Sequence, residues 1–400
     1  MEDWLNLWVV KMKIGYVLIS FPILSETFIL NEIIELKKKR HKVTIFSVSS
    51  PKENIIQPEI KKFNLLEDVF YLPDKKLVEK IESGLKSLGF FGRDHEVKNL
   101  REKILAIIAA KYFVEKAKNL KLDILHAHFN GISVQVAMLM SKKLDIPFTF
   151  TAHAFDIFIN PNIKVLKKRM KNASAVITPS YYNRDYLYNL TGIDKEKIHV
   201  IRACTNIDKF ETIKKNKDVT ILSGGRLVEK KGIKYGILSV KELIKDFPNI
   251  QYNVIGSGPL ENELKNLISS LNLENNVKFF GSLDSNSVRN ELSRATIFIL
   301  PCVRAKNGDL DVCPLALQEA MLAKIPVIST NMGSVPELIE NGKEGFLVKS
   351  RNVKQLVDSI KTLLENKKLR IKMGENGRKK IEKEFNIHKE IEKLLKIWSV

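Results

Sequence analysis

The clearest indication of the fold is the segment Asp218-Val-Thr-Ile-Leu-Ser-Gly-Gly-Arg-Leu-Val-Glu-Lys-Lys-Gly232. It starts with the apolar run at residues 219–222, passes through two glycines and leads into a helical pattern. A short apolar run that ends in a tight turn before a helix is typical of a buried strand in a parallel sheet. The segment therefore predicts one strand–turn–helix unit of an α/β domain.

The same alternation of apolar runs and helical patterns continues on both sides of this segment. In the first half, strands are predicted at residues 13–20, 41–48, 122–128, 146–153 and 173–180. In the second half, they are predicted at residues 218–225, 250–258, 276–282, 295–301, 325–330 and 344–350. Strands that alternate with helices form parallel sheets with crossover helices. The predicted fold class is therefore α/β, with two doubly wound, Rossmann-like domains that face each other across a cleft.

The sheet pattern pauses at residues 203–215, which predicts a domain boundary there. We expect a first domain at residues 1–205, a second at 206–380, and a C-terminal helix at 381–400 that packs back toward the first domain. From Val353 onward the pattern predicts continuous helix. Met12 is a candidate for the natural start, because the first predicted strand follows it directly. Ligands of parallel sheets bind beyond the carboxyl ends of the strands, so the residues after each strand are the candidates.

The composition fits two folded domains and narrows the classes of partner. Among 400 residues, 44% are hydrophobic, and 66 basic against 46 acidic residues give a formal net charge of +20. Such a charge attracts phosphates, nucleic acid or an anionic membrane. Because most lysines are spread along amphipathic helices, we expect no nucleic-acid partner.

Three cysteines without a C-x-x-C pair predict neither disulfides nor zinc, and they favour the cytoplasm. The apolar stretch at residues 4–10 is too short to cross a membrane.

Positive side chains follow the strand at residues 219–222. Gly224 and Gly225 let backbone amides approach phosphate oxygens, while Arg226 offers a planar fork and Lys231 a point charge. The turn suits a diphosphate, but a surface turn with solvated lysines explains it equally well. The next strand ends in Val254-Ile-Gly-Ser-Gly-Pro-Leu260, where Glu261 replaces the third glycine of a dinucleotide fingerprint. Gly256 is therefore assigned to a tight turn beside a nucleotide, and binding of NAD is not expected.

The segment Asn307-Gly-Asp-Leu-Asp-Val-Cys-Pro-Leu-Ala-Leu-Gln-Glu-Ala-Met321 has an acid near each end. Pro314 is predicted as the first helical residue, so free amides at residues 312–316, among them Cys313 and Leu315, are expected to point toward an anion or a sugar hydroxyl. Asp311 precedes these amides and Glu319 follows them, and together they suit an extended polyhydroxy ligand. The D-x-D pattern at 309–311 is common in loops, and no metal site is predicted.

Histidines end two predicted strands of the first half. His126, His128 and His153 are expected to point into the cleft, although a histidine at a strand end often serves only to satisfy backbone groups. Asp156 either orients His153 or caps the following helix.

Five of these motifs occur in an order that resembles a known family. They are Phe21-Pro-Ile-Leu-Ser-Glu-Thr-Phe-Ile-Leu30, His126-Ala-His-Phe129, Phe150-Thr-Ala-His-Ala-Phe-Asp156, Gly225-Arg-Leu-Val-Glu-Lys-Lys-Gly232 and the residues from Asp311 to Met321. In them the chain resembles the retaining glycosyltransferases of family four, which have the GT-B fold, and particularly the branch that builds colanic-acid-like exopolysaccharides. The resemblance implies transfer of a hexose-type sugar from a nucleoside-diphosphate sugar to a saccharide or lipid-linked acceptor. Neither a cofactor nor a metal ion is expected.

The resemblance also implies roles for individual residues. Arg226 and Lys231 would hold the donor diphosphate, and Glu319 would bind the ribose. Asp311 stands where most of the family has the first glutamate of an E-x7-E pair, and it would contact the donor sugar. Ser25 lies in a loop that approaches the diphosphate, and His153 matches a histidine near the transferred sugar. The resemblance further implies a mechanism that retains the configuration of the sugar, in which the acceptor attacks from the same face and the leaving phosphate assists.

Two amphipathic segments are candidates for contact with an anionic membrane. Residues 160–171 place Ile163, Leu166 and Met170 on one face, and residues 75–91 form the second candidate; an ordinary core-facing helix is the alternative for each. For the whole chain, a sugar epimerase or phosphorylase of the same architecture is an alternative function. A non-catalytic protein that binds nucleotides or nucleic acid is the alternative from a different class.

Overall fold

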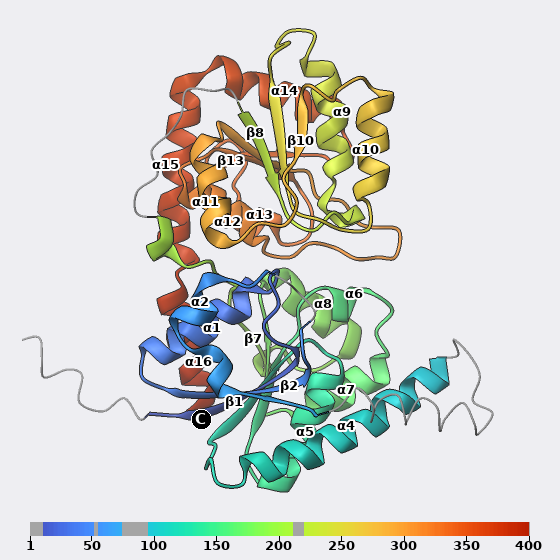
Figure 1. Cartoon of the computed structure of the whole chain (residues 1–400), viewed down its shortest axis with the longest axis vertical. Coiled ribbons are helices and arrows are strands. Elements are labelled where there is room, and N and C mark those ends of the chain that lie inside the picture. Colours follow the sequence, from blue (N-terminus) through green and yellow to red (C-terminus); the bar gives the residue numbers. More distant parts are fainter. Residues whose placement is uncertain (1–10, 52–54, 74–94, 211–219, 400) are drawn as a thin grey trace, which may run out of the picture.

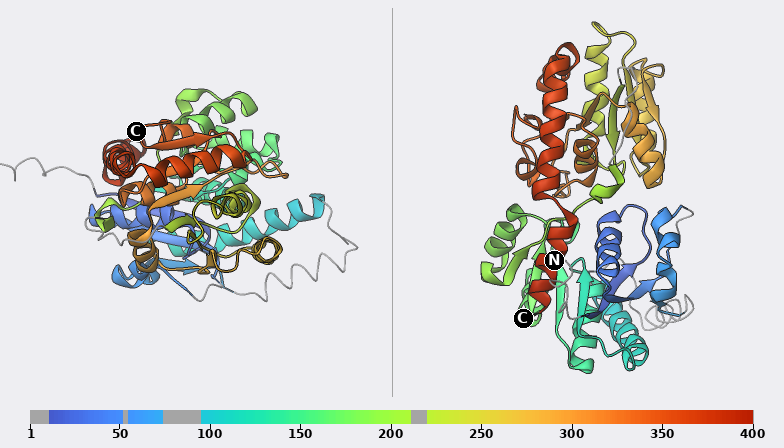
Figure 2. Two further views of the ribbon diagram at one scale, coloured as in Figure 1. Left: turned by 90° about the horizontal axis from the view of Figure 1, so that it is seen from above. Right: turned by 90° about the vertical axis from the view of Figure 1, so that its left-hand side faces the viewer.

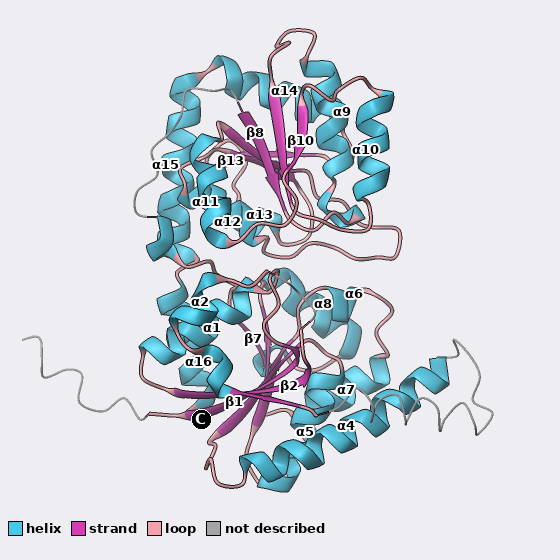
Figure 3. Ribbon diagram, viewed as in Figure 1, coloured by secondary structure: helices cyan, strands magenta, loops and turns pink. Residues whose placement is uncertain are grey.

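Two α/β domains lie one above the other in the structure (Figure 1). It is a computed structural model, and it describes residues 11–51, 55–73, 95–210 and 220–399. Each domain is built on a parallel sheet with helices on both sides (Figure 3). The predicted fold class, with two doubly wound domains, is confirmed.

The first sheet contains seven parallel strands in the order β3-β2-β1-β4-β5-β6-β7. These strands are β1 (Lys13–Ser20), β2 (Lys42–Ser49), β3 (Val69–Tyr71), β4 (Ile124–His128), β5 (Phe148–Thr151), β6 (Ala175–Thr178) and β7 (Ile198–Val200). The helices of this domain are α1 (Thr27–Lys38), α2 (Pro58–Lys62), α4 (His95–Ala117), α5 (Ile132–Leu144), α6 (Phe155–Phe158), α7 (Ile163–Asn172) and α8 (Tyr181–Thr191). β3 and β7, each of three residues, were not predicted from the sequence.

The second sheet contains six parallel strands in the order β10-β9-β8-β11-β12-β13. These strands are β8 (Thr220–Gly224), β9 (Gln251–Ile255), β10 (Val277–Phe279), β11 (Ile297–Leu300), β12 (Val327–Thr330) and β13 (Gly345–Val348). The helices between them are α9 (Ile233–Leu243), α10 (Glu261–Ser270), α11 (Ser285–Arg294), α12 (Leu315–Leu322) and α13 (Val335–Leu338). Strands β11 and β12 are buried along their whole length, as expected for central strands covered on both faces.

Three separate helices close the chain, so the prediction of continuous helix from Val353 onward is wrong. They are α14 (Val353–Glu365), α15 (Lys367–Glu384) and α16 (Ile387–Trp398). Asn366 and Asn386 interrupt the helical pattern, because the side chain of each accepts a hydrogen bond from a backbone amide at the start of the next helix. Figure 2 shows α16, in red, alongside the first domain, where it packs against α1. There the indole Nε1 of Trp398 donates to Thr149 Oγ1 at 2.9 Å.

Strand order changes direction once in each sheet, between β1 and β4 in the first and between β8 and β11 in the second. Loops at such a switch point diverge and leave room for a ligand beyond the carboxyl ends of the strands. In this chain the loops after β1, β4, β8 and β11 all line one space between the domains. The fold therefore brings two switch points to the same place.

Candidate functional site

A cleft of about 1340 Å³ separates the two domains. Loops that follow strands of both sheets form its walls. Eleven of the residues that the sequence predicted for the site line this cleft: Ser25, His153, Gly225, Arg226, Lys231, Gly256, Asp311, Cys313, Pro314, Leu315 and Glu319. The fold thus places side chains from distant parts of the sequence around one volume.

Two ion pairs cross the second-domain wall between the loops after β8 and β11. Lys231 Nζ lies 2.5 Å from Asp311 Oδ2, and Lys230 Nζ lies 3.1 Å from Asp309 Oδ1. Burial on its own would lower the pKa of Lys231, but the Asp311 carboxylate outweighs it and the pKa is raised. For Asp311, burial favours the protonated form, yet Lys231 and Lys230 hold the pKa below its ordinary value. Both groups of this pair are therefore charged at neutral pH.

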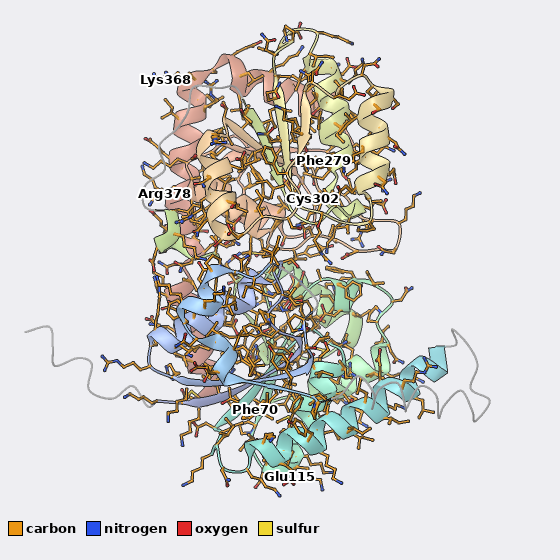
Figure 4. All side chains as sticks on the ribbon, in the orientation of Figure 1. Phe70, Glu115, Phe279, Cys302, Lys368 and Arg378 are labelled. Atoms are coloured by element: carbon orange, nitrogen blue, oxygen red, sulfur yellow. The ribbon has the colours of Figure 1, made fainter. Side chains whose placement is uncertain are left out.

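The pairing also explains why the D-x-D pattern does not offer open carboxylates. Asp309 is held by Lys230 and Asp311 by Lys231, so each carboxylate already has a cationic partner. The thiol of Cys302, labelled in Figure 4, lies 3.9 Å from Asp311 Oδ2, and burial raises its pKa to about 12. This thiol is uncharged at neutral pH and adds no negative charge beside the pair.

Arg226 differs from Lys231 in its surroundings. Its side chain is exposed in the cleft wall, and no hydrogen bond or ion pair to it is found in the described part of the chain. Its charge acts on Lys231, whose pKa it lowers slightly against the effect of Asp311. The wall thus carries two lysines that are fixed by carboxylates and an arginine that faces the open cleft.

Gly225 and Gly256 lie where the ends of β8 and β9 meet. The Gly225 amide donates to Ile255 O at 3.0 Å and the Gly256 amide to Gly281 O at 2.7 Å, so neither is free for a phosphate. Gly256 has a φ of 124°, and a Cβ at this residue would lie 2.0 Å from Gly225 O. Gly256 is therefore required because the ends of β8 and β9 touch.

Free backbone amides are found at the start of α12 instead. Pro314 is the N-cap residue, one position before its predicted place, and the Cys313 amide donates to Ser334 Oγ at 2.9 Å. Within the described residues, no protein acceptor is found for the amides of Leu315 and Ala316. Amides at a helix start carry partial positive charge, so this end of α12 favours an anion or a hydroxyl oxygen.

Glu319 lies on α12 and also faces the cleft. Burial raises its pKa to about 7, against the opposing effects of Lys209 and of a hydrogen bond with Thr205. A carboxyl group in this range is partly protonated at neutral pH, and it is ready to accept hydrogen bonds once a ligand supplies donors.

The histidines of the first domain do not all face the cleft. His126 and His128 are fully buried, because β4 is covered on both sides, and only His153 lines the cleft. The prediction that all three point into the cleft is therefore wrong for His126 and His128. Asp156 accepts the backbone N–H groups of His153 and Asn130, at 3.0 and 2.7 Å, and does not contact the His153 ring. Burial raises the pKa of Asp156 to about 6.

Sequence reasoning missed several residues that complete the site. Glu32 lies under the first-domain wall beside His128, while Lys230, Lys209 and Thr205 surround the acids of the second domain. Glu32 occupies an ordinary amphipathic helix, and no local pattern marks it. Lys230 could have been found from the sequence, because it is adjacent to Lys231 and the segment Asp309-Leu-Asp311 offers two aspartates as partners.

Of the two predicted membrane-binding segments, one can be assessed. In α7, Leu166 and Met170 are fully buried in the core, and only Ile163 of the apolar face is exposed. The apolar face of this helix is therefore not available to a membrane. The second segment, residues 75–91, lies outside the described residues. Among those that are described, no helix is long and apolar enough to cross a bilayer.

Two facing doubly wound domains with a cleft at both switch points define the GT-B class of glycosyltransferase architecture. Residues 25–209 match the family model described as "Glycosyltransferase Family 4". Residues 205–380 match the family model described as "Glycosyl transferases group 1". A Haemophilus influenzae protein described as an uncharacterized glycosyltransferase is 30% identical, over 70% of this chain and 76% of its own length. The chain belongs to this family of glycosyltransferases, as its motifs predicted.

Relatives and solved structures extend the similarity over nearly the whole chain. The putative colanic acid biosynthesis glycosyltransferase WcaL of Escherichia coli is 28% identical, over 96% of this chain and 99% of its own. Among solved structures, Anabaena Alr3699/HepE in complex with UDP and glucose superposes with a TM-score of 0.71 at 19% identity, covering 97% of this chain and 99% of that one. At this identity the structural similarity concerns the fold.

Proposed function

We propose that this protein is a retaining glycosyltransferase of surface polysaccharide biosynthesis. It moves a hexose-type sugar from a nucleoside-diphosphate sugar to a saccharide or to a lipid-linked glycan. The observation that carries the proposal is the grouping of Arg226, Lys231, Glu319 and the start of α12 around one interdomain cleft. The relative named for colanic acid biosynthesis supports the polysaccharide context.

In this proposal the second-domain wall binds the donor nucleotide. Arg226 and Lys231 hold the diphosphate and neutralise the charge that develops on it as the sugar leaves. The amides of Leu315 and Ala316 face the same group. Glu319 accepts hydrogen bonds from the ribose hydroxyls, which favour its ionised form. Because side chains and amides supply the positive charge, the transfer needs no metal ion.

The sugar lies between the two walls. Asp311 keeps Lys231 charged and in place through their contact at 2.5 Å, and its second oxygen is directed to the sugar. His153 approaches the sugar from the first domain, and Ser25 approaches the diphosphate. No cofactor takes part. The acceptor hydroxyl attacks from the face that the nucleotide leaves, and the departing phosphate takes its proton.

A transfer assay tests the proposal. The purified chain is incubated with UDP-glucose, UDP-N-acetylglucosamine and GDP-mannose, each with and without EDTA, and with a mixture of lipid-linked glycans. We expect nucleoside diphosphate to be released together with a glycosylated product for one donor, equally in EDTA. Formation of an epimer of the donor sugar, incorporation of phosphate, or no turnover with any donor would contradict it.

We also propose that the protein binds anionic membranes through its positive charge, because a lipid-linked acceptor lies at such a surface. Sedimentation with vesicles of phosphatidylglycerol and phosphatidylcholine tests this. Binding at low salt and release at high salt are expected, since exposed charges are screened. A protein that stays in solution at every ionic strength contradicts it.

A further inference from the structure

A chain of buried hydrogen bonds leads from the centre of the first domain to His153 at the cleft. The Tyr16 hydroxyl donates to Glu32 Oε1 at 2.6 Å, and the same oxygen lies 3.3 Å from His128 Nε2. On the other side of its ring, His128 Nδ1 lies 3.0 Å from His153 Nε2. Tyr16, Glu32 and His128 come from β1, α1 and β4, so three elements converge on one side chain of the cleft wall.

With an ionised Glu32 and an uncharged His128, the chemistry of these groups sets the direction of the chain. An ionised carboxylate only accepts hydrogen bonds, so His128 Nε2 carries a hydrogen and donates it to Glu32. The Nδ1 of an uncharged His128 is then an acceptor, and His153 Nε2 must donate to it. His153 is left with a free electron pair on Nδ1. No contact of this atom is found within the described chain, and His153 lines the cleft.

Its surroundings hold the His153 ring in place and keep it uncharged. Phe28 and Phe129 pack against it, with ring centroids 4.7 and 4.5 Å from the imidazole centroid. Burial lowers the pKa of His153 well below its ordinary value. Glu32, Tyr16, His126 and Asp156 are the other titratable groups around it, and Asp156 contacts only its backbone.

A metal site is the alternative use of the same cluster, because the ligand atoms of Glu32, His126 and His128 lie within 4.8 Å of one another. Both ring nitrogens of His126 already have partners, with Thr149 Oγ1 at 2.8 Å and Thr151 Oγ1 at 3.1 Å. No polar side-chain atom of the three residues is buried without a partner. An empty metal site would leave such atoms behind, so hydrogen bonding accounts for the cluster without an ion.

We propose that Glu32 and His128 are positioning residues that hold His153 uncharged, with its proton on Nε2, so that Nδ1 accepts a hydrogen bond from a hydroxyl of the transferred sugar. A phosphate oxygen is also an acceptor and would be repelled there. The first-domain wall therefore selects a hydroxyl, while the second-domain wall binds the diphosphate. The identity of the ligand group rests on the proposed function; the protonation of the two histidines does not.

Nitrogen-15 NMR of the full chain, with labelled histidine and no ligand, tests the protonation directly at neutral pH. His128→Asn and His153→Asn variants assign the two signals. We expect both rings to be uncharged with the proton on Nε2. A His153 ring that is charged, or that carries its proton on Nδ1, would overturn the proposal, as would one tightly bound equivalent of zinc. Because no substrate is present, this result stands whether or not the chain transfers sugar.

Two variants of similar shape test whether Glu32 acts as a hydrogen-bond acceptor or only through packing. Glu32→Met removes the acceptor oxygen, so we expect mixed protonation of His153 and a fall in kcat/KM of about tenfold. Glu32→Gln keeps an oxygen, and we expect Nε2 protonation and activity within about twofold of the wild-type value. Equal behaviour of the two variants would contradict the proposal.

Glu35→Gln is the matched control on the same helix. Glu35 Oε1 lies 2.7 Å from His388 Nδ1, a carboxylate–histidine contact away from the cleft. Losing it should change neither the protonation of His153 nor kcat/KM by more than about twofold. If Glu32→Met does not fold, the wild-type spectrum still decides the assignment.

Discussion

The second-domain wall of the cleft presents charge, whereas the first-domain wall presents an uncharged ring at the end of a buried network. Arg226 is exposed and Lys231 is paired with Asp311. His153 is surrounded by Phe28, Phe129 and His128. A charged wall suits a leaving diphosphate and an uncharged acceptor suits a sugar hydroxyl. The comparison teaches that one cleft can divide two tasks between its domains, and the variants below test each side of that division.

Lys231→Ala should have the largest effect, because it removes a cation from the proposed diphosphate site and leaves Asp311 with less compensation. We expect kcat/KM to fall by about 10²–10³. The free energy of unfolding should fall by about 3 kcal/mol, since Asp311 is only 8% exposed. Steady-state kinetics and urea unfolding measure the two effects. Lys245→Ala, at an exposed surface pair, is the control and should change neither. Activity that survives in Lys231→Ala would remove the charged wall from the account.

Arg226→Ala should weaken donor binding without affecting stability. The side chain is exposed and has no partner in the described chain, so the free energy of unfolding should change by less than about 0.5 kcal/mol. The dissociation constant for the donor nucleotide should rise by about 10- to 100-fold. Arg226→Lys should recover part of the affinity. An equal affinity in all three proteins, measured by calorimetry, contradicts a contact with the diphosphate.

Glu319→Gln should change how stability depends on pH. The folded pKa is raised to about 7 from an ordinary value of 4.5, so the folded state binds the proton more tightly than the unfolded state. Stability is therefore lost as pH rises from about 4.5 to about 7, and the loss persists above that range. The variant lacks this titration, and we expect it to gain about 3 kcal/mol relative to the wild type between pH 4 and pH 8. Parallel unfolding curves at both pH values would contradict the raised pKa.

Trp398→Phe should have the smallest effect. It removes the indole N–H that donates to Thr149 Oγ1 at 2.9 Å, and it should cost about 1 kcal/mol of unfolding free energy. Because Trp398 belongs to α16 and does not line the cleft, kcat/KM should stay within about twofold. A large loss of transfer without a loss of stability would show that α16 acts on the first-domain wall more directly.

Much of the fold could be predicted from local patterns. Apolar runs such as those at residues 295–301 and 325–330 mark central strands, because burial on both faces leaves no polar alternation. The edge strand β3 and the edge strand β7 were not predicted from such runs. Asn366 and Asn386 fit the helical period of the sequence, so the period alone does not show that a helix ends there. The helices are separate because the side chain of each asparagine caps the start of the next helix.

The site was predictable where its chemistry lies in one segment and unpredictable where it depends on contacts between segments. Arg226, Lys231 and Glu319 sit in motifs, so their presence at the cleft could be foreseen. The engagement of the Gly225 amide with Ile255 depends on how β8 and β9 meet, and the network of Glu32, His128 and His153 depends on packing between elements. Neither this hydrogen bond nor this network can be recognised from the spacing of residues in the sequence.

Isothermal titration with UDP and UDP-glucose tests the central claim most directly, because it reports binding by the second-domain wall independently of the acceptor. For the wild type we predict saturable binding of one nucleotide per chain, unaffected by EDTA. Affinity should be lost in Lys231→Ala and retained in Lys245→Ala. A nucleotide that binds the Lys231→Ala variant as tightly as the wild type would contradict the account.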